Sequence, residues 1–114
     1  MIGGHKESRQ FSRLNFSGPL RCQVRGSQEI INTVSEDLSL SGVKFINNKF
    51  IAPSTSVMLE INLKPNIIRP IARIIWSSAL PRQDKFSLGA EFMELDSKDK
   101  KNLADYLNMR IPQQ

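Results

Sequence analysis

Apolar and polar residues alternate through the middle of the chain, which is the pattern of β-strands that bury one face. Residues 57–63 give the clearest example, because Val57, Leu59, Ile61 and Leu63 fall on one side of an extended chain. Five further segments are short, rich in β-branched or apolar residues, and bounded by Gly, Pro or polar residues. They are residues 16–25, 29–35, 43–46, 71–76 and 86–93. The pattern therefore predicts six short strands.

The last part of the chain has a helical period instead. Apolar positions recur three or four residues apart from Leu103 onward, Asp96 or Ser97 can cap the first turn, and Pro112 ends the pattern. We predict one amphipathic helix over residues 96–110. Its apolar side is expected to cover an open end or side of the β-structure, and a helix that binds a partner protein is the alternative.

The absence of a helical pattern between the six strands argues against a parallel sheet, since parallel strands need long crossover connections that are usually helices. The expected architecture is all-β with a terminal helix, built as a small antiparallel barrel or sandwich. The chain has 114 residues, the length of one domain. We expect a single domain over residues 1–114, in which residues 16–93 form the barrel and residues 1–14 a flexible segment.

The chain carries 16 Lys and Arg against 11 Asp and Glu, a formal net charge of +5. This excess favours an anionic partner without distinguishing nucleic acid, nucleotide and membrane surface. It is concentrated at the start, where His5, Lys6, Arg9 and Arg13 are opposed only by Glu7. No apolar run approaches the roughly 20 residues that span a bilayer, and no export signal is evident. We expect a cytoplasmic protein that does not insert into the membrane.

Few residues are suited to catalysis. The one histidine, His5, lies in the polar first segment, and the one cysteine, Cys22, occupies a strand position typical of a small buried residue. The sequence has no Gly-x-Ser-x-Gly elbow, no phosphate-binding Gly-x-x-x-x-Gly-Lys loop and no His-Glu-x-x-His motif. We therefore expect a binding module that is not an enzyme and uses no metal and no cofactor.

Two short motifs flank the first two predicted strands. Arg9-Gln-Phe-Ser-Arg13 precedes the first strand, and Asp37-Leu-Ser-Leu-Ser-Gly42 lies in the expected turn between the second and third. Either motif alone is common, and the second can simply be an Asx or Ser turn that ends in glycine. In this order and at this separation, the pair resembles the signature of the PilZ domain family.

The resemblance extends over residues 6–106. It includes the apolar strand that ends in Trp76, the segment Leu88-Gly-Ala-Glu-Phe92, and the helix after Leu95-Asp96. It implies a six-stranded antiparallel β-barrel closed by a C-terminal α-helix, in agreement with the elements predicted above. The usual ligand of the family, and so the ligand implied here, is cyclic di-GMP.

The resemblance implies that Arg9 and Arg13 make the principal base and phosphate contacts. A guanidinium can donate two hydrogen bonds to guanine O6 and N7, and its plane can stack on a purine. Asp37 suits the guanine N1–H and N2–H₂ donors, or it orients one of the arginines through an ion pair. Ser39 can donate a hydrogen bond to a base or phosphate. Gly42 permits a positive φ or a close approach of the ligand to the backbone.

Three more residues are candidates. Ser41 is either a further ligand contact or a local cap of the turn. Trp76 is either a core residue or a stacking partner for a guanine. Ser8 stands where many relatives of the family carry a further arginine. That difference leaves open whether one ligand or an intercalated pair is bound.

These features predict a receptor or adaptor that changes conformation when cyclic di-GMP binds and then signals to a downstream partner protein. Our hypothesis is that the N-terminal segment folds across the barrel on binding. The resemblance implies a role in motility, exopolysaccharide production or biofilm control. One alternative is a degenerate PilZ-like module that binds a protein and no nucleotide. Another, a barrel that binds single-stranded nucleic acid, is disfavoured because Phe45, Phe86 and Phe92 occupy apparent core positions.

Overall fold

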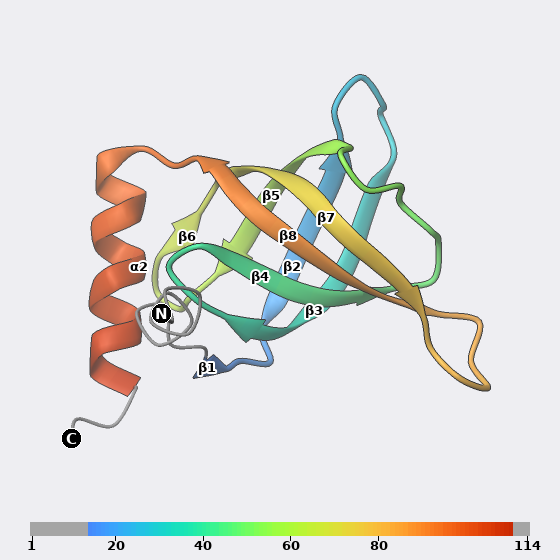
Figure 1. The fold of residues 1–114 in the computed structure, drawn as a ribbon. Helices are drawn as coiled ribbons and strands as arrows, with labels where there is room; N and C mark the ends of the chain where they lie inside the picture. The colour runs from blue at the N-terminus through green and yellow to red at the C-terminus, as the bar shows by residue number, and fades with distance from the viewer. Residues whose placement is uncertain (1–13, 111–114) are drawn as a thin grey trace, which may run out of the picture.

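The computed structural model describes residues 14–110, which contain eight strands and one helix (Figure 1). The elements, in chain order, are β1 (Leu14–Asn15), β2 (Pro19–Val24), β3 (Ile30–Leu38), β4 (Gly42–Asn47), β5 (Ser56–Asn62), β6 (Ile67–Ile68), β7 (Ile71–Ala79), β8 (Phe86–Glu94) and α2 (Ser97–Arg110). Every strand pair is antiparallel. The six segments predicted from alternation correspond to the six longer strands.

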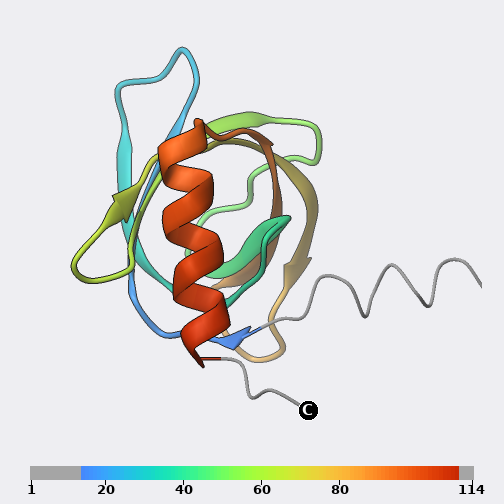
Figure 2. The same cartoon turned by 90° about the vertical axis from the view of Figure 1, so that its left-hand side faces the viewer.

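Six of the strands form a closed barrel. Their order around the ring is β3, β2, β5, β7, β8 and β4, and the pairing of β3 with β4 closes it. The two short strands are additions, because β1 pairs with β3 and β6 pairs with β5. Figure 2, which looks toward the helix, shows the strands as a ring behind it. The predicted fold class, a six-stranded antiparallel barrel with a C-terminal helix, is confirmed.

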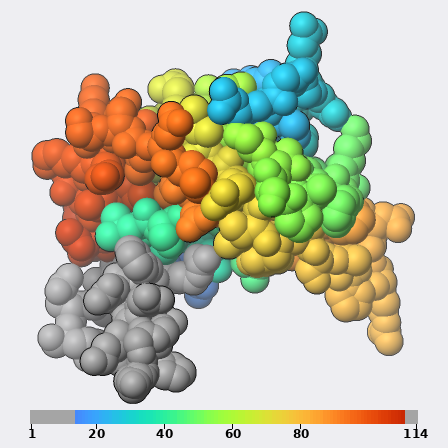
Figure 3. Space-filling view, turned by 45° about the horizontal axis from the view of Figure 1, so that its top comes forward, coloured from blue at the N-terminus to red at the C-terminus, as the bar shows by residue number. Residues whose placement is uncertain are grey.

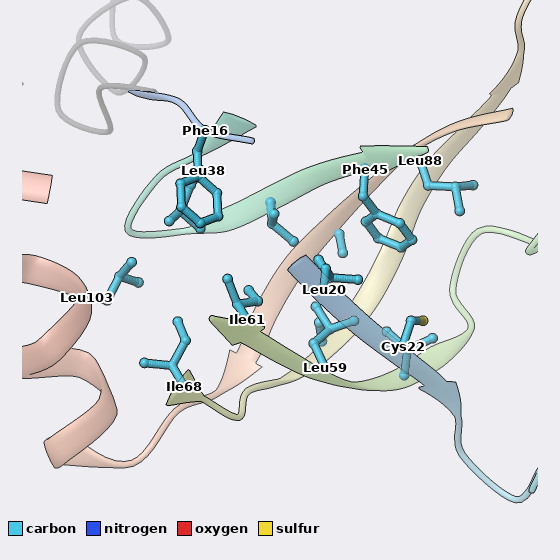
Figure 4. Close-up of a cluster of buried hydrophobic side chains, with 14 of the residues drawn as sticks. Phe16, Leu20, Cys22, Leu38, Phe45, Leu59, Ile61, Ile68, Leu88 and Leu103 are labelled. Carbon is cyan, nitrogen blue, oxygen red and sulfur yellow. The ribbon is translucent and has the colours of Figure 1, made fainter. Parts of the chain in front are cut away.

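The inside of the barrel is filled by side chains from alternate positions of the strands (Figure 4). In β5, Val57 and Ile61 are fully buried, as the alternation predicted. Phe45 of β4 is fully buried as well, and Phe86 and Phe92 of β8 are partly buried against the same core. The inward-facing apolar positions of the strands therefore form one continuous core.

Helix α2 lies across one open end of the barrel (Figures 1 and 2). Leu103 and Leu107 are buried in the core, and the ring of Tyr106 meets that of Phe16 edge-on, with centroids 5.6 Å apart. The Oδ1 atom of Asp96 accepts a hydrogen bond from the Asp99 amide at 2.8 Å, which caps the first turn. The helix therefore covers an end of the barrel, as its apolar side predicted.

Three strand boundaries differ from the predicted ones by three residues, and one of them is the end of β7, which continues to Ala79 instead of ending at Trp76. Strand β2 begins at Pro19, three residues later than expected, and β3 continues to Leu38 instead of ending at Ser35. The register between β3 and β4 shifts between Ser35 and Asp37, which interrupts the alternation of this strand. Asp37 therefore belongs to a strand, and the turn between β3 and β4 is shorter than the motif suggested.

The hairpin that connects β7 and β8 projects from the barrel at the end away from α2 (Figures 1 and 3). Its loop, residues 80–85, lies between the last residue of β7 and the first of β8. Within residues 14–110, no helix combines the length and the apolar character needed to cross a bilayer.

Candidate ligand-binding face

The second motif forms the tight turn from β3 to β4. The amide of Ser39 donates to the carbonyl oxygen of Gly42 at 2.9 Å, and the amide of Ser41 donates to Ser39 Oγ at 3.2 Å. The two serine hydroxyls lie 3.2 Å apart. Ser39 is only 1% exposed, whereas Ser41 is half-buried. The Ser39 hydroxyl therefore stabilises the turn, and a ligand contact from it stays a prediction.

Gly42 is required by the packing of its own strand. Among the described glycines only Gly26 has a positive φ, of 85°, so of the two alternatives given for Gly42 the positive φ does not apply. A β-carbon at Gly42 would lie 2.2 Å from the carbonyl oxygen of Ala90 in β8. The backbone that approaches Gly42 closely is therefore that of the neighbouring strand β8. This contact accounts for the glycine whether or not a ligand binds.

Asp37 lies on the outer face of the barrel. It is opposite Lys44 of β4, and the next pair along, Leu38 and Val43, is fully buried. Because successive side chains of a strand point to opposite faces, Asp37 and Lys44 point outward. The ammonium of Lys44 is 3.6 Å from a carboxylate oxygen of Glu36. A lysine and a carboxylate thus stand side by side at the motif.

Trp76 also lies on the outer face, so the prediction that it is a core residue is wrong. It is opposite Gly89 of β8 and 38% exposed. A β-carbon at Gly89 would lie 2.3 Å from the indole Nε1 atom, so the indole packs flat on the glycine. A half-exposed indole held against a strand in this way can stack on a flat ligand.

Strand register brings these residues into one line, here called the outer-face row: Asp37 of β3, Lys44 of β4, Gly89 of β8 and Trp76 of β7. Each member is the cross-strand partner of the next. Three strand spacings separate the ends of the row, or about 14 Å. Sequence reasoning missed Lys44, although a position two residues after Gly42 in a strand points to the same face.

The residues of the first motif, Arg9 and Arg13, and the neighbouring Ser8 lie outside the described residues. The chain is described from Leu14, which pairs with Leu38, and the next residue, Asn15, pairs with Asp37. Strand β1 therefore runs beside the part of β3 that carries Asp37. The position that follows the arginine motif is joined to the barrel at one end of the outer-face row.

The described residues place charged side chains and one indole on the outer wall of the barrel. No group of three or more His, Cys, Asp or Glu side chains among residues 14–110 is arranged to hold a metal ion. Cys22 points into the core, as predicted, and its burial raises the pKa of the thiol to about 11. Arg73 and Glu91 form an exposed ion pair at 3.3 Å on the outer face of β7 and β8. The surface therefore offers hydrogen-bonding groups, charges and one indole.

The described residues thus form a six-stranded antiparallel barrel covered by a C-terminal helix, with a Ser–Gly turn beside an outward aspartate. A sequence model of the PilZ domain matches residues 7–109. The chain belongs to the PilZ domain family. A comparison with curated protein sequences gave no match.

Solved structures of PilZ proteins have the same fold. The Bacillus subtilis inhibitor of motility MotI/DgrA superposes with a TM-score of 0.77 at 22% identity, over 90% of this chain and 50% of that one. Escherichia coli YcgR in complex with c-di-GMP gives 0.72 at 16% identity, over 89% and 45%. The PilZ domain of YcgR with c-di-GMP gives 0.66 at 17%, over 89% of both chains. The chain thus spans about half the length of the first two proteins.

Proposed function

We propose that this chain is a receptor for cyclic di-GMP that binds the dinucleotide between the Arg9–Arg13 motif and the outer-face row. The observation that carries the proposal is the pairing of Asn15 with Asp37, since it joins the segment after the arginines to the strand that bears the second motif. Two solved structures of the same fold are described as complexes with c-di-GMP.

The residues divide the recognition between them. Arg9 and Arg13 supply forked donors to guanine O6 and N7 and charge for the phosphates. Asp37 accepts from the guanine N1–H and N2–H₂ groups, and Lys44, which points outward beside it, adds a phosphate contact. Trp76, at the other end of the row, offers a flat surface for a base. Ser39 and Gly42 hold the turn, and Ser41 lies at its surface.

We propose that binding changes the conformation of the chain and that a partner protein recognises the changed conformation. On this view residues 1–13 close on the ligand, and their new arrangement presents a surface to a downstream protein of the cytoplasm. The chain catalyses no reaction and needs no cofactor in this role. The regulated process would be motility, exopolysaccharide production or biofilm formation.

Calorimetry with cyclic di-GMP tests the proposal, with cyclic di-AMP and GMP as competing compounds and Arg13→Ala as the variant. We expect selective binding in the micromolar range, about −8 kcal/mol. Loss of one forked guanine contact should weaken it by about 1–3 kcal/mol, or roughly 5- to 150-fold. Arg25→Ala, an exposed arginine just after β2, is the matched control and should bind as the parent does. The fitted stoichiometry distinguishes one ligand from an intercalated pair.

Two results would count against the receptor. Equal binding of GMP and cyclic di-GMP, or an Arg13→Ala variant that binds as tightly as the parent, would contradict the assigned recognition. The absence of heat and of competition at high concentration would favour the alternative, a PilZ-like module that binds a protein without nucleotide.

A further inference from the structure

The barrel has a second outward surface that the proposed nucleotide site does not use. Strand β5 is three places from β4 in either direction around the ring, so the two strands form opposite walls (Figure 1). On the outside of β2 and β5 is a hollow of about 240 Å³, here called the β2–β5 hollow. The side chains that matter for its chemistry are Arg21, Ile30, Met58, Glu60, Arg69 and Ile71.

The floor of the β2–β5 hollow is apolar. Met58 and Ile30 are 40% and 39% exposed, although both are large hydrophobic residues. Pro70 and Ile71 line the same hollow from the start of β7. Burial of such a cluster removes apolar surface from water, at roughly 25 cal/mol per Å². A side chain that enters the hollow would therefore gain hydrophobic contact.

The rim of the hollow has an excess of positive charge. Arg21 Nη1 lies 3.4 Å from one carboxylate oxygen of Glu60, and Arg69 Nε lies 3.4 Å from the other. Among residues 14–110, Glu60 is the only ion-pair partner of either arginine. Each guanidinium has five N–H donors, so most of the donors on this rim are not used by Glu60. Asp99 also lies beside Arg69, but its Oδ2 atom accepts from the backbone amide of Arg69 at 2.8 Å, so the guanidinium donors of the two arginines can bind a further carboxylate.

We propose that the β2–β5 hollow docks a short segment of a partner protein that carries an apolar side chain next to an Asp or Glu. The apolar side chain contacts Met58 and Ile71, and the carboxylate binds Arg21 and Arg69. A hollow of about 240 Å³ takes only one or two side chains, whereas stable protein interfaces involve about 20–30 residues a side and bury roughly 1,200–2,000 Å². The occupant is therefore a short segment bound reversibly, and arginine is a frequent anchor in such contacts.

This surface adds a partner site to the proposed receptor without depending on nucleotide binding. Because β4 and β5 lie on opposite walls, the outer-face row and the β2–β5 hollow can be occupied at the same time. A test made without nucleotide separates the two proposals, since a failure of cyclic di-GMP to bind leaves the docking result unaffected.

Selection from a library of random 12-residue peptides displayed on phage, against the immobilised full chain without nucleotide, is the first step. We expect enriched peptides to share an Asp or Glu within two residues of a large apolar side chain. When one such peptide is titrated into the ¹⁵N-labelled protein, the amide shifts should be confined to the residues that line the hollow, namely residues 21–23, 30, 58–60 and 69–71. Enrichment of peptides without an acidic residue, no enrichment at all, or shifts centred on residues 37–42 would overturn the proposal.

Charge reversal at the rim supplies the second step. Arg69→Glu should weaken the selected peptide at least tenfold, and Arg21→Glu, an independent variant at the same rim, should do likewise. Arg82→Glu is the matched control, because Arg82 is an exposed arginine in the loop between β7 and β8, which does not line the hollow. It should stay within twofold of the parent. Binding that is unchanged in both rim variants, with thermal unfolding confirming that they are folded, contradicts the assigned surface.

Discussion

Gly42 lies where β4 runs beside β8, with the carbonyl oxygen of Ala90 only 2.2 Å from the place of a β-carbon. The contact is with backbone, which cannot rotate away as a side chain can. The glycine of the second motif is thus needed for the barrel to close at this point, whatever the motif binds. Its neighbour Ser39 is likewise used within the turn.

Replacement of Gly42 by Ala should therefore destabilise the fold, by about 1–3 kcal/mol as is typical of overpacking. Urea unfolding followed by Trp76 fluorescence measures this loss. Gly26→Ala is the control: Gly26 has no neighbour within 4 Å but a φ of 85°. Its free energy of unfolding should fall only by the cost of holding alanine in a left-handed backbone conformation, about 1 kcal/mol. A Gly42→Ala protein at least as stable as the Gly26→Ala protein would contradict the close approach.

Cys22 makes the stability depend on pH in the alkaline range. Burial raises the pKa of its thiol from 9.0 to about 11, so the unfolded chain ionises first as the pH rises. The stabilising contribution is complete below pH 9 and is lost between about pH 9 and pH 11. From pH 8 to pH 10 the loss should be about 1 kcal/mol. Urea unfolding of the parent and of Cys22→Val at both values isolates it, and equal losses in the two proteins would refute the assignment.

The six longer strands and the helix could be predicted from the sequence, because each is long enough to show its characteristic spacing of apolar residues. Strands β1 and β6 have two residues each, too few for alternation, and they were missed. The bulge after Ser35 hid the last residues of β3, so Asp37 was placed in a turn. Neighbours across strands, such as Lys44 beside Asp37, depend on register. Register is set by the whole barrel and cannot be read from a period.

Helix α2 is held to the barrel by a few buried leucines. Leu107→Ala should cost about 2–5 kcal/mol, since it leaves a cavity where the helix covers the end of the barrel. Met109, two residues further on, is 80% exposed, and Met109→Ala should stay within about 0.5 kcal/mol of the parent. Thermal unfolding of the two variants compares them directly. Equal stabilities would show that the helix is not part of the folded core.

At the scale of the whole molecule, the proposed recognition is shared between the barrel wall, which carries Asp37, Lys44 and Trp76, and two arginines that precede the barrel in the sequence. Within residues 14–110, the buried apolar residues of the core run from Phe16 to Leu107. The two arginines proposed to read the ligand, Arg9 and Arg13, both precede that span. The barrel should therefore tolerate changes at its start that abolish binding.

Deletion of residues 2–13 tests whether binding can be lost while the barrel stays folded. We expect a barrel whose melting temperature changes by only a few degrees, because the core formed by the described residues, from Phe16 to Leu107, is kept whole. Binding of cyclic di-GMP should be lost in calorimetry. A variant with residues 2–13 kept and only Arg9 and Arg13 changed to Ala serves as the control and should behave alike. A truncated protein that fails to fold would show that the barrel needs residues 2–13, and one that binds as the parent does would show that the two arginines are not needed for binding.

The closure of the barrel also determines how another chain can meet this one. In the part of the chain that the structure describes, the ring strands pair on both sides, so little unpaired backbone is offered at an edge. An incoming strand therefore finds few main-chain donors and acceptors with which to extend the sheet, and the same closure protects against edge-to-edge aggregation. Recognition at the barrel wall is left to side chains, which substitution can alter one at a time while the backbone ladder stays intact.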